Sequence, residues 1–350
     1  MPHSNRNRRW KHRPEGSNWG EFGEDDQIGR MHLVTAGKVL EGVRQVQAGR
    51  NFVLSLPLDI PGRSVLNPSR HPPVLRPTLR KGQVNFKCLL DPRRPDVLSD
   101  DLAVLHLQYS TQWDSLAHAG TRFDADGDGL PETRYYNGYG AEDMQGPAGV
   151  EGCGLDSGPP YAGTSRARAL GIEQLARTGV QGVGVMIDLE AHFGPGRTLV
   201  GYDKLRQVLD AEAIEVGPGD LVCVHTGYAE ALLGMQGNPD SAVLAETGAV
   251  LDGYDARLLR WIDESGLAAI ASDNLAVEDY PSRSNDPCCS ALPLHTHCLV
   301  KLGIHLGELW RLTPLAHWLR AHRRHRFLLT APPLDLPGAV GSPVSPVATV

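Results

Sequence analysis

The order of apolar and amphipathic segments predicts an α/β fold with some parallel strand pairing. From residue 102 to residue 329, short apolar runs typical of strands alternate with stretches whose apolar residues recur at helical spacing. The chain has 350 residues, of which 41% are hydrophobic, so it can bury a sizeable core. No internal repeat and no convincing linker interrupts residues 18–330, which favours a single domain.

The first expected element is a helix over residues 35–48, where apolar residues share one face, Thr35 can cap the N-terminus and Gly49 ends the pattern. Residues 51–58 alternate as a strand does. Segments rich in Pro and Arg at 61–80 and 92–96 predict long loops. Further strands are expected at 102–108, 183–188, 220–224, 267–272 and 326–329. Helices are expected between them at 171–178, 203–212, 255–264, 295–302 and 314–323.

Charge and composition argue against several classes of protein. The chain has 34 Lys and Arg against 41 Asp and Glu, a net charge of −7, which does not suit binding along a nucleic-acid backbone. No apolar run approaches the roughly 20 residues that cross a bilayer. The six cysteines contain no CxxC pair, and residues 1–17 are basic without the apolar core of a secretory signal. We therefore expect a soluble cytoplasmic protein with a flexible basic arm at residues 1–17.

One group of polar residues follows the strand expected at 102–108. Asp114 and His118 are four residues apart, and Gln108 and Gln112 lie just upstream. A carboxylate and an imidazole that converge on one point suit a divalent cation, with the imidazole as ligand or as base. The spacing also occurs by chance in many proteins, so a purely structural role stays open.

A second group lies far downstream, where His295 and His297 begin a helical pattern and Glu308 opens the next element. Two histidines and a carboxylate within 14 residues are able to complete a metal site. The alternative is a solvated face that carries both histidines. Asp188 and Glu278 follow other apolar runs, a position where caps and surface groups are commoner than sites.

An acidic segment at residues 124–132 matches the first part of a calcium loop. Its oxygen-bearing residues are Asp124, Asp126, Asp128 and Glu132, and a glycine stands at the sixth position. The twelfth position is Tyr135, which has no carboxylate to offer. The segment therefore fits either a structural calcium site or an acidic turn.

The residues around Asp114 resemble a known family. Residues 110–118, STQWDSLAH, are similar to the signature of the cyclase family of metal-dependent hydrolases, which includes kynurenine formamidase and isatin hydrolase, in its large Q-W-D branch. Residues 18–29, 136–138, 184–188, 219–227, 272–278, 292–295 and 302–310 resemble further family segments in the same order. The resemblance thus covers residues 18–350.

The resemblance implies roles for several residues. Asp114, His295 and Glu308 match the family's metal ligands, and His118 matches its catalytic acid or base. Gln112 and Gln108 stand where the family signature has histidines. Because glutamine is a neutral, weak ligand, one manganese or zinc ion is expected rather than two, with Gln112 as a further ligand.

The resemblance also implies a fold and an assembly. It predicts a swivelling β/α/β domain at residues 18–350, with a central mixed, mostly closed sheet flanked by helices. The last 20 residues alone fit either a Pro-rich tail or a final strand, and the resemblance favours a closing strand. It makes the acidic segment 124–132 an insertion, and it implies a homodimer or homotetramer.

The activity implied is hydrolysis of a small amide, lactam or lactone by a metal-activated water, with His118 as proton carrier. Trp19, Trp113 and Tyr136 are either core residues or groups that stack on a planar substrate. Two alternatives remain open: a metal-dependent dehydratase or true cyclase that uses the same proton chemistry, and a non-catalytic binding protein with a degenerate metal site.

Overall fold

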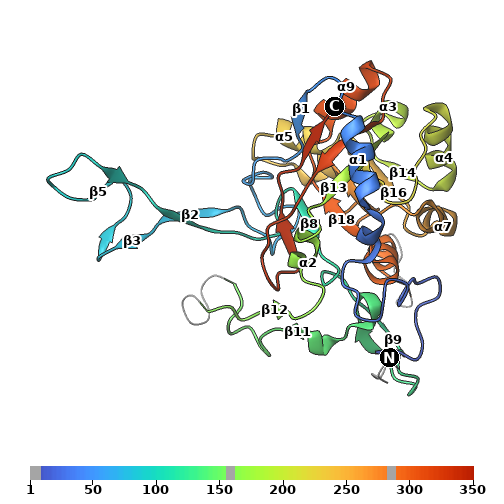
Figure 1. The fold of residues 1–350 in the computed structure, drawn as a ribbon, viewed down its shortest axis with the longest axis horizontal. Coiled ribbons are helices and arrows are strands. Elements are labelled where there is room, and N and C mark those ends of the chain that lie inside the picture. Colours follow the sequence, from blue (N-terminus) through green and yellow to red (C-terminus); the bar gives the residue numbers. More distant parts are fainter. Residues whose placement is uncertain (1–8, 155–161, 282–288) are drawn as a thin grey trace.

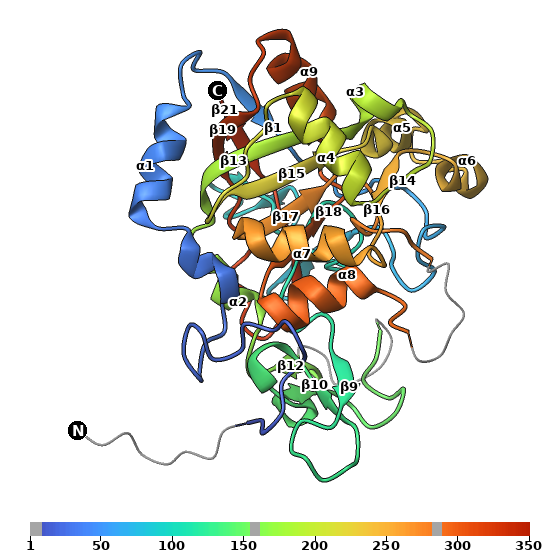
Figure 2. The same ribbon diagram turned by 90° about the vertical axis from the view of Figure 1, so that its right-hand side faces the viewer.

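A nine-stranded mixed sheet forms the centre of the computed structural model, which describes residues 9–154, 162–281 and 289–350 (Figures 1 and 2). The strand order is β1-β21-β19-β13-β15-β17-β18-β8-β20. The bounds are β1 Asn51–Val53, β8 Gln112–Asp114, β13 Gln181–Asp188, β15 Leu221–His225, β17 Ala269–Ser272, β18 His305–Glu308, β19 Arg326–Thr330, β20 Gly341–Pro343 and β21 Val347–Thr349. The α/β prediction is confirmed.

The sheet is curled but open, so the expectation of a mostly closed sheet is wrong. Among the described residues, β1 and β20 each pair with one neighbour only and therefore form the two edges. The four strands β13, β15, β17 and β18 are parallel, and β8 runs antiparallel to β18. The swivelling arrangement stays a prediction.

The central strands are buried on both faces, which explains their nearly continuous apolar sequences. All residues of β15 and β17 are buried. The strands expected at 183–188, 220–224, 267–272 and 326–329 are confirmed as β13, β15, β17 and β19. At the C-terminus, β21 lies between β1 and β19, so the closing strand is also confirmed.

Helices cover both faces of the sheet (Figure 2). On one face, α4 (Tyr202–Ala211), α7 (Ala256–Ser265), α8 (Pro293–His295) and the π-helical turn η4 (Thr296–Leu302) enclose a core with β13, β15 and β17. On the other face lies α9 (Thr313–Ala321). The expected helix at 35–48 is α1 (Ala36–Arg44), which begins at the predicted cap Thr35, ends earlier than expected and packs on β13 and β19.

The remaining elements are short. They are η1 Gly29–Leu33, β9 Thr121–Phe123, β10 Glu132–Arg134, η2 Tyr136–Gly138, η3 Ala141–Asp143, β11 Met144–Gln145, β12 Arg166–Ala167, α2 Ile172–Ala176, α3 Leu189–Phe193, β14 Thr198–Val200, α5 Tyr228–Gly234, α6 Ser241–Ala245 and β16 Ala249–Leu251. No helix within the described part of the chain combines the length and the apolar character needed to span a membrane.

Residues 74–104 leave the body as a long two-stranded extension that divides into two hairpins at its far end (Figure 1). It consists of three antiparallel pairs: β2 (Val74–Pro77) with β7 (Asp101–Val104), β3 (Leu79–Arg80) with β4 (Gln83–Val84), and β5 (Cys88–Leu89) with β6 (Val97–Leu98). Part of the predicted loops is therefore strand. The strand expected at 102–108 belongs to this extension and not to the central sheet.

The described part of the basic N-terminal segment packs on the body. Trp10 is buried and meets the ring of Trp19 edge to face at 5.5 Å. Arg9 pairs with Asp25 at 2.6 Å. The expected flexible arm at residues 1–17 thus does not hold for residues 9–17, and residues 1–8 lie outside the described residues.

Candidate metal centre

Three elements bring Asp114, His295 and Glu308 together. In the antiparallel pair β18–β8, Leu306 lies opposite Asp114 and Glu308 lies opposite Gln112, so both carboxylates are on one face. His295, in α8, approaches from the next layer. Its Nε2 is 3.3 Å from Oε1 of Glu308 and 3.9 Å from Oδ2 of Asp114. One ligand atom from each residue lies within 4.8 Å of the others.

The chemistry of this group fits a divalent cation. Asp114 is fully buried, and within the described structure neither of its carboxylate oxygens has a hydrogen-bond partner. Burying an ionised carboxylate without a partner is costly, and here burial raises the pKa of Asp114 to about 6. A bound cation removes that cost. One imidazole and two carboxylates form a donor set that zinc and manganese both accept.

Glu278 orients the imidazole ligand. Nδ1 of His295 donates to Oε1 of Glu278 at 2.7 Å, which leaves Nε2 directed at Asp114 and Glu308. The backbone N–H groups of Leu294 and His295 also donate to the Glu278 carboxylate. Burial opposes a charge on His295, but Glu278 and Glu308 outweigh it and raise the pKa of His295 to about 10. The electrostatic potential around Nε2 is therefore strongly negative, as a cation site requires.

Gln112 and Gln108 occupy different environments. Nε2 of Gln112 donates to Oε2 of Glu308 at 2.6 Å, which fixes that carboxylate. Its Oε1 is buried without a hydrogen-bond partner among the described residues and is an additional oxygen beside the group. Gln108 packs instead on β20, where its Nε2 would lie 2.5 Å from a Cβ at Gly341.

His118 lies beside the group and borders a pocket that is open to solvent and that His295 and Glu308 also line. Its Nε2 is 3.8 Å from Oδ1 of Asp114, and its side chain is 24% exposed. The pocket is lined by His118, His295, Glu308, Arg70 and Asn67 together with apolar side chains such as Leu275 and Leu292 and with Tyr280. Arg70 is held there by donating to the backbone oxygen of Gln108 at 2.8 Å.

The aromatic residues singled out in the sequence do not line this pocket. Trp113 is buried and its indole N–H donates to the oxygen of Ala331. Trp19 donates in the same way to Val300, and the hydroxyl of Tyr136 donates to Asp26. All three pack in the core. Tyr280, which does border the pocket, was not predicted from the sequence.

His297 does not belong to the group formed by Asp114, His295 and Glu308. It is buried in η4, and burial lowers its pKa to about 4, so it is neutral. The group that holds three ligand atoms together contains His295 but not His297. The two histidines, two residues apart on a helical turn, therefore point in different directions.

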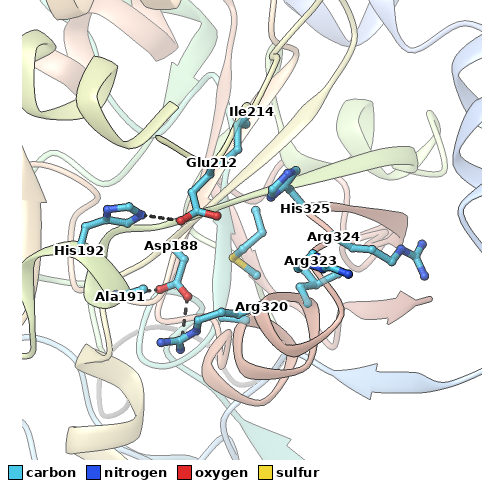
Figure 3. A pocket seen from close by; sticks show the side chains of 12 residues that line it. Asp188, Ala191, His192, Glu212, Ile214, Arg320, Arg323, Arg324 and His325 are labelled. Carbon is cyan, nitrogen blue, oxygen red and sulfur yellow. Dashed lines mark hydrogen bonds and ion pairs between the residues drawn. The ribbon is translucent and has the colours of Figure 1, made fainter. Parts of the chain in front are cut away.

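A second group of similar composition, Asp188, Glu190 and His225, already has partners. Nδ1 of His225 donates to Oδ1 of Asp188 at 2.7 Å, and its Nε2 is 2.9 Å from Oγ1 of Thr313. Oδ2 of Asp188 accepts no hydrogen bond from the described residues but lies 3.3 Å from Nη2 of Arg320, and Figure 3 shows this ion pair at the wall of a pocket. Protein groups thus already supply the positive charge and the hydrogen bonds that satisfy Asp188 and His225, so this group does not need a metal ion.

The acidic segment 124–132 forms the turn between β9 and β10. Its aspartate oxygens accept backbone N–H groups: Asp124 accepts from residues 127, 128 and 129, and Asp128 accepts from residue 130. Glu132 accepts from Arg134 and from the N–H of Ala125. Only Asp124, Asp126 and Asp128 come close enough to share an ion, and calcium binding stays a prediction.

Known proteins are similar to this chain in sequence or in fold. A family described as "Putative cyclase" matches residues 54–279. A solved structure described as a novel cyclase is 29% identical, with a TM-score of 0.73, over 95% of this chain and 97% of that one. Isatin hydrolase A from Labrenzia aggregata, bound to benzyl benzoate, is 13% identical, with a TM-score of 0.54, over 90% and 98%. Isatin hydrolase A from Ralstonia solanacearum is 14% identical, with a TM-score of 0.53, over 85% and 91%. No curated protein is significantly similar in sequence.

Proposed function

This chain belongs to the cyclase family, as the resemblance of residues 18–350 predicts, and on that basis we propose that it is a metal-dependent hydrolase of a small amide, lactam or lactone. The observation that carries the proposal is the buried carboxylate of Asp114, which has no hydrogen-bond partner within the described structure and faces His295 and Glu308. The similarity of fold to proteins named isatin hydrolase supports an enzyme over a binding protein.

Asp114, His295 and Glu308 would hold one manganese or zinc ion, with Oε1 of Gln112 beside them. When bound, such an ion makes water more acidic and polarises a carbonyl group. Gln108 packs on Gly341 and Gln112 donates to Glu308, so neither supplies the imidazole that a second ion would use. The chain therefore suits one ion.

His118 is the proton carrier in this proposal. Its ring borders the pocket, lies next to Asp114 and is partly exposed, so it can exchange protons with both substrate and solvent. It accepts a proton as water attacks the carbonyl and returns a proton to the leaving nitrogen or oxygen. A positioned acid or base of this kind is typically worth about 10²–10⁴-fold in rate.

The pocket walls favour a small substrate with an apolar body. Leu275, Leu292 and Tyr280 offer apolar contact, while Arg70 supplies positive charge and Asn67 an amide. The negative charge that develops on a carbonyl oxygen during attack is stabilised by a nearby guanidinium. Arg70 lies close enough to Asp114 to lower its pKa, against the larger effect of burial.

Elemental analysis of the purified chain, paired with a screen of N-formyl amides, cyclic imides and lactones, tests the proposal. We expect stoichiometric manganese or zinc and hydrolysis of at least one of these classes. Hydrolysis that survives complete removal of the metal would contradict the mechanism. A chain that binds neither manganese nor zinc, and turns over nothing, would favour the binding-protein alternative.

One observation keeps a dehydratase or cyclase as the second candidate. The solved structure that is 29% identical to this chain is described as a novel cyclase. The proton transfer assigned to His118 also serves loss of water from a substrate. Following the mass of the product separates the two, because hydrolysis adds a water molecule and dehydration removes one.

A further inference from the structure

A larger pocket lies next to the one that borders the candidate metal centre. The pocket lined by His118, His295 and Glu308 is here called the metal pocket and has a volume of about 100 Å³. The larger one, called the side pocket, has a volume of about 210 Å³ and is lined mainly by apolar side chains, among them Leu244 and Val250. A largely apolar pocket with a few polar groups is typical of a site that binds a small molecule.

The two pockets share one wall. Leu66, Leu275, Ala276 and Tyr280 line both of them. Leu66 and Leu275 are only half-buried, and Tyr280 is 45% exposed, so part of each of these side chains is open to the pockets. A molecule bound in the metal pocket therefore contacts the same side chains that border the side pocket.

Glu278 lies between a candidate metal ligand and the side pocket. Its Oε1 accepts the hydrogen bond from Nδ1 of His295 at 2.7 Å, and its side chain also lines the side pocket. His295 in turn lines the metal pocket, so the side pocket begins one side chain behind this ligand. One substrate molecule is thus able to place its carbonyl at the metal centre and another part in the side pocket.

A buried hydroxyl group in the side pocket lacks a partner. Tyr228 is 4% exposed and lines the side pocket, and its hydroxyl makes no hydrogen bond with the described residues. Burial raises the pKa of Tyr228 to about 12, against the smaller opposite effect of Arg197, so the hydroxyl keeps its proton and can donate it. Because a buried tyrosine hydroxyl normally has a partner, this one indicates a ligand with a hydrogen-bonding group.

The charged and amide groups of the side pocket are already satisfied by the protein. Nη2 of Arg197 donates to Oδ1 of Asp279 at 2.6 Å. Nδ2 of Asn274 donates to the backbone oxygen of Ala249 at 3.0 Å. Glu278 is bound to His295, as described above. Since these charges are paired, the side pocket suits an uncharged group rather than an anion or a cation.

We propose that the side pocket binds the part of the substrate that is remote from the reacting carbonyl, an uncharged apolar chain or ring whose far end hydrogen-bonds to Tyr228. This inference rests on the proposed function and narrows its substrate class to amides, lactams or lactones that carry such a substituent. Leu66 and Leu275 contact the substituent where it leaves the metal pocket. Tyr228 selects among substrates by their far end.

Isothermal titration calorimetry of the metal-loaded chain with straight-chain hydroxamates, from acetohydroxamate to octanohydroxamate, tests the proposal. Hydroxamates bind zinc and manganese through two oxygen atoms, so all members share one anchor and only the apolar chain changes. Affinity should rise about threefold for each methylene group that enters the side pocket.

A variant that narrows the side pocket separates its contribution from that of the metal pocket. Ala245→Trp changes an exposed residue of the side pocket, so it should fold and bind metal normally. It should remove the gain for octanohydroxamate and leave acetohydroxamate unchanged. The matched control is Ala242→Trp, an exposed position of the same helix that is not among the described lining residues, and it should change neither affinity.

The role of Tyr228 is tested with hydroxamates that carry a hydroxyl group at the far end. Tyr228→Phe removes a hydroxyl without a protein partner, so metal content and stability to urea should not change. At the chain length that reaches Tyr228, the hydroxylated ligand should bind the variant about fivefold more weakly than the unmodified chain. Plain alkyl hydroxamates should bind both proteins equally, and equal binding of the hydroxylated ligands would refute the role of Tyr228.

Equal affinity for acetohydroxamate and octanohydroxamate, or a gain that persists in Ala245→Trp, would overturn the inference and leave the proposed function intact. A chain that binds no hydroxamate, acetohydroxamate included, would instead contradict the proposed metal site, and the inference would fall with it. The two failures are therefore distinguishable. If Ala245→Trp misfolds, Ala245→Phe is measured in the same way and is judged by the same outcomes.

Discussion

Two clusters on the central sheet contain the same residue types but differ in how their polar atoms are satisfied. Asp114, His295 and Glu308 form one, and Asp188, Glu190 and His225 form the other. In the second, His225 is bound on both ring nitrogens and Asp188 faces Arg320. In the first, neither oxygen of Asp114 has a hydrogen-bond partner within the described residues, and the nearest ring nitrogens, of His118 and His295, are 3.8 and 3.9 Å away. A buried carboxylate with neither a hydrogen bond nor a permanently charged arginine beside it, and not residue composition, indicates where a cation fits.

The largest expected difference in metal content and turnover is between two variants, each with the aspartate of one cluster replaced by asparagine. Asp114→Asn should lose the metal ion and reduce turnover to background, because the site loses a charged ligand. The matched variant Asp188→Asn should keep both metal and turnover. Elemental analysis and a hydrolysis assay on the two proteins measure this. Equal metal loss in both variants would remove the distinction between the clusters.

The same two variants should affect the stability of the metal-free chain in opposite directions. Asp114→Asn removes a buried charge that has no hydrogen-bond partner among the described residues, so the metal-free chain should become more stable to urea. Asp188→Asn breaks a paired group and should destabilise the chain by about 1–3 kcal/mol. A metal-free Asp114→Asn protein that is clearly less stable than its parent would mean that Asp114 has protein partners after all.

Substitution of His118 should slow turnover without loss of metal. His118→Ala should reduce the rate by about 10²–10⁴-fold, because the proton carrier is gone while the three ligands remain. The control is His192→Ala, whose ring pairs with Glu212 beside the other pocket, as Figure 3 shows. Unchanged activity in His118→Ala would refute its assignment.

Glu278 supports the first cluster from outside, and its loss should have a smaller effect. Glu278→Gln keeps the size of the side chain but weakens the hydrogen bond that orients His295. Metal affinity should fall by about 10–100-fold, measured by competition with a chelator. Glu212→Gln alters the carboxylate–histidine pair with His192 and should leave metal affinity as it was.

The smallest effect concerns pH and the second cluster. Burial alone would raise the pKa of Asp188, but its hydrogen bond with His225 outweighs burial and lowers that pKa. Burial alone would lower the pKa of His225, but Asp188 and Asp273 outweigh burial and raise that pKa. The Asp188 contribution is present above its unfolded pKa of about 3.9 and is lost as pH falls through its folded pKa. The His225 contribution is present below its unfolded pKa of about 6.5 and is lost as pH rises through its folded pKa.

The stability difference between the unmodified chain and Asp188→Asn should therefore be largest between about pH 4 and pH 6.5. Urea unfolding of both proteins across this range measures it. A difference that does not vary with pH would show that the pair is not charged in the folded chain.

The buried parallel strands were predictable because they are continuous apolar runs, as in β13 and β15. The strands β8 and β18 were not, because Gln112, Asp114 and Glu308 make them polar and hide their place inside the sheet. The ligands themselves came from the resemblance to the cyclase family and not from spacing alone.

Other features depend on contacts that the sequence pattern does not show. Glu278 lies 17 residues before His295, and only folding joins the two. The sequence of residues 74–104 does not predict strands, because it is rich in Pro and Arg and its strands are only two to four residues long. Trp19, Trp113 and Tyr136 have hydrogen-bond partners in the core, which aromatic residues in a sequence do not reveal.

Anomalous X-ray diffraction from crystals of the manganese-loaded chain tests the central claim most directly. The account predicts one anomalous peak, bounded by Asp114, His295 and Glu308, and none beside Asp188 and His225. A peak at the second cluster, or manganese-loaded crystals with no peak at the first, would contradict it.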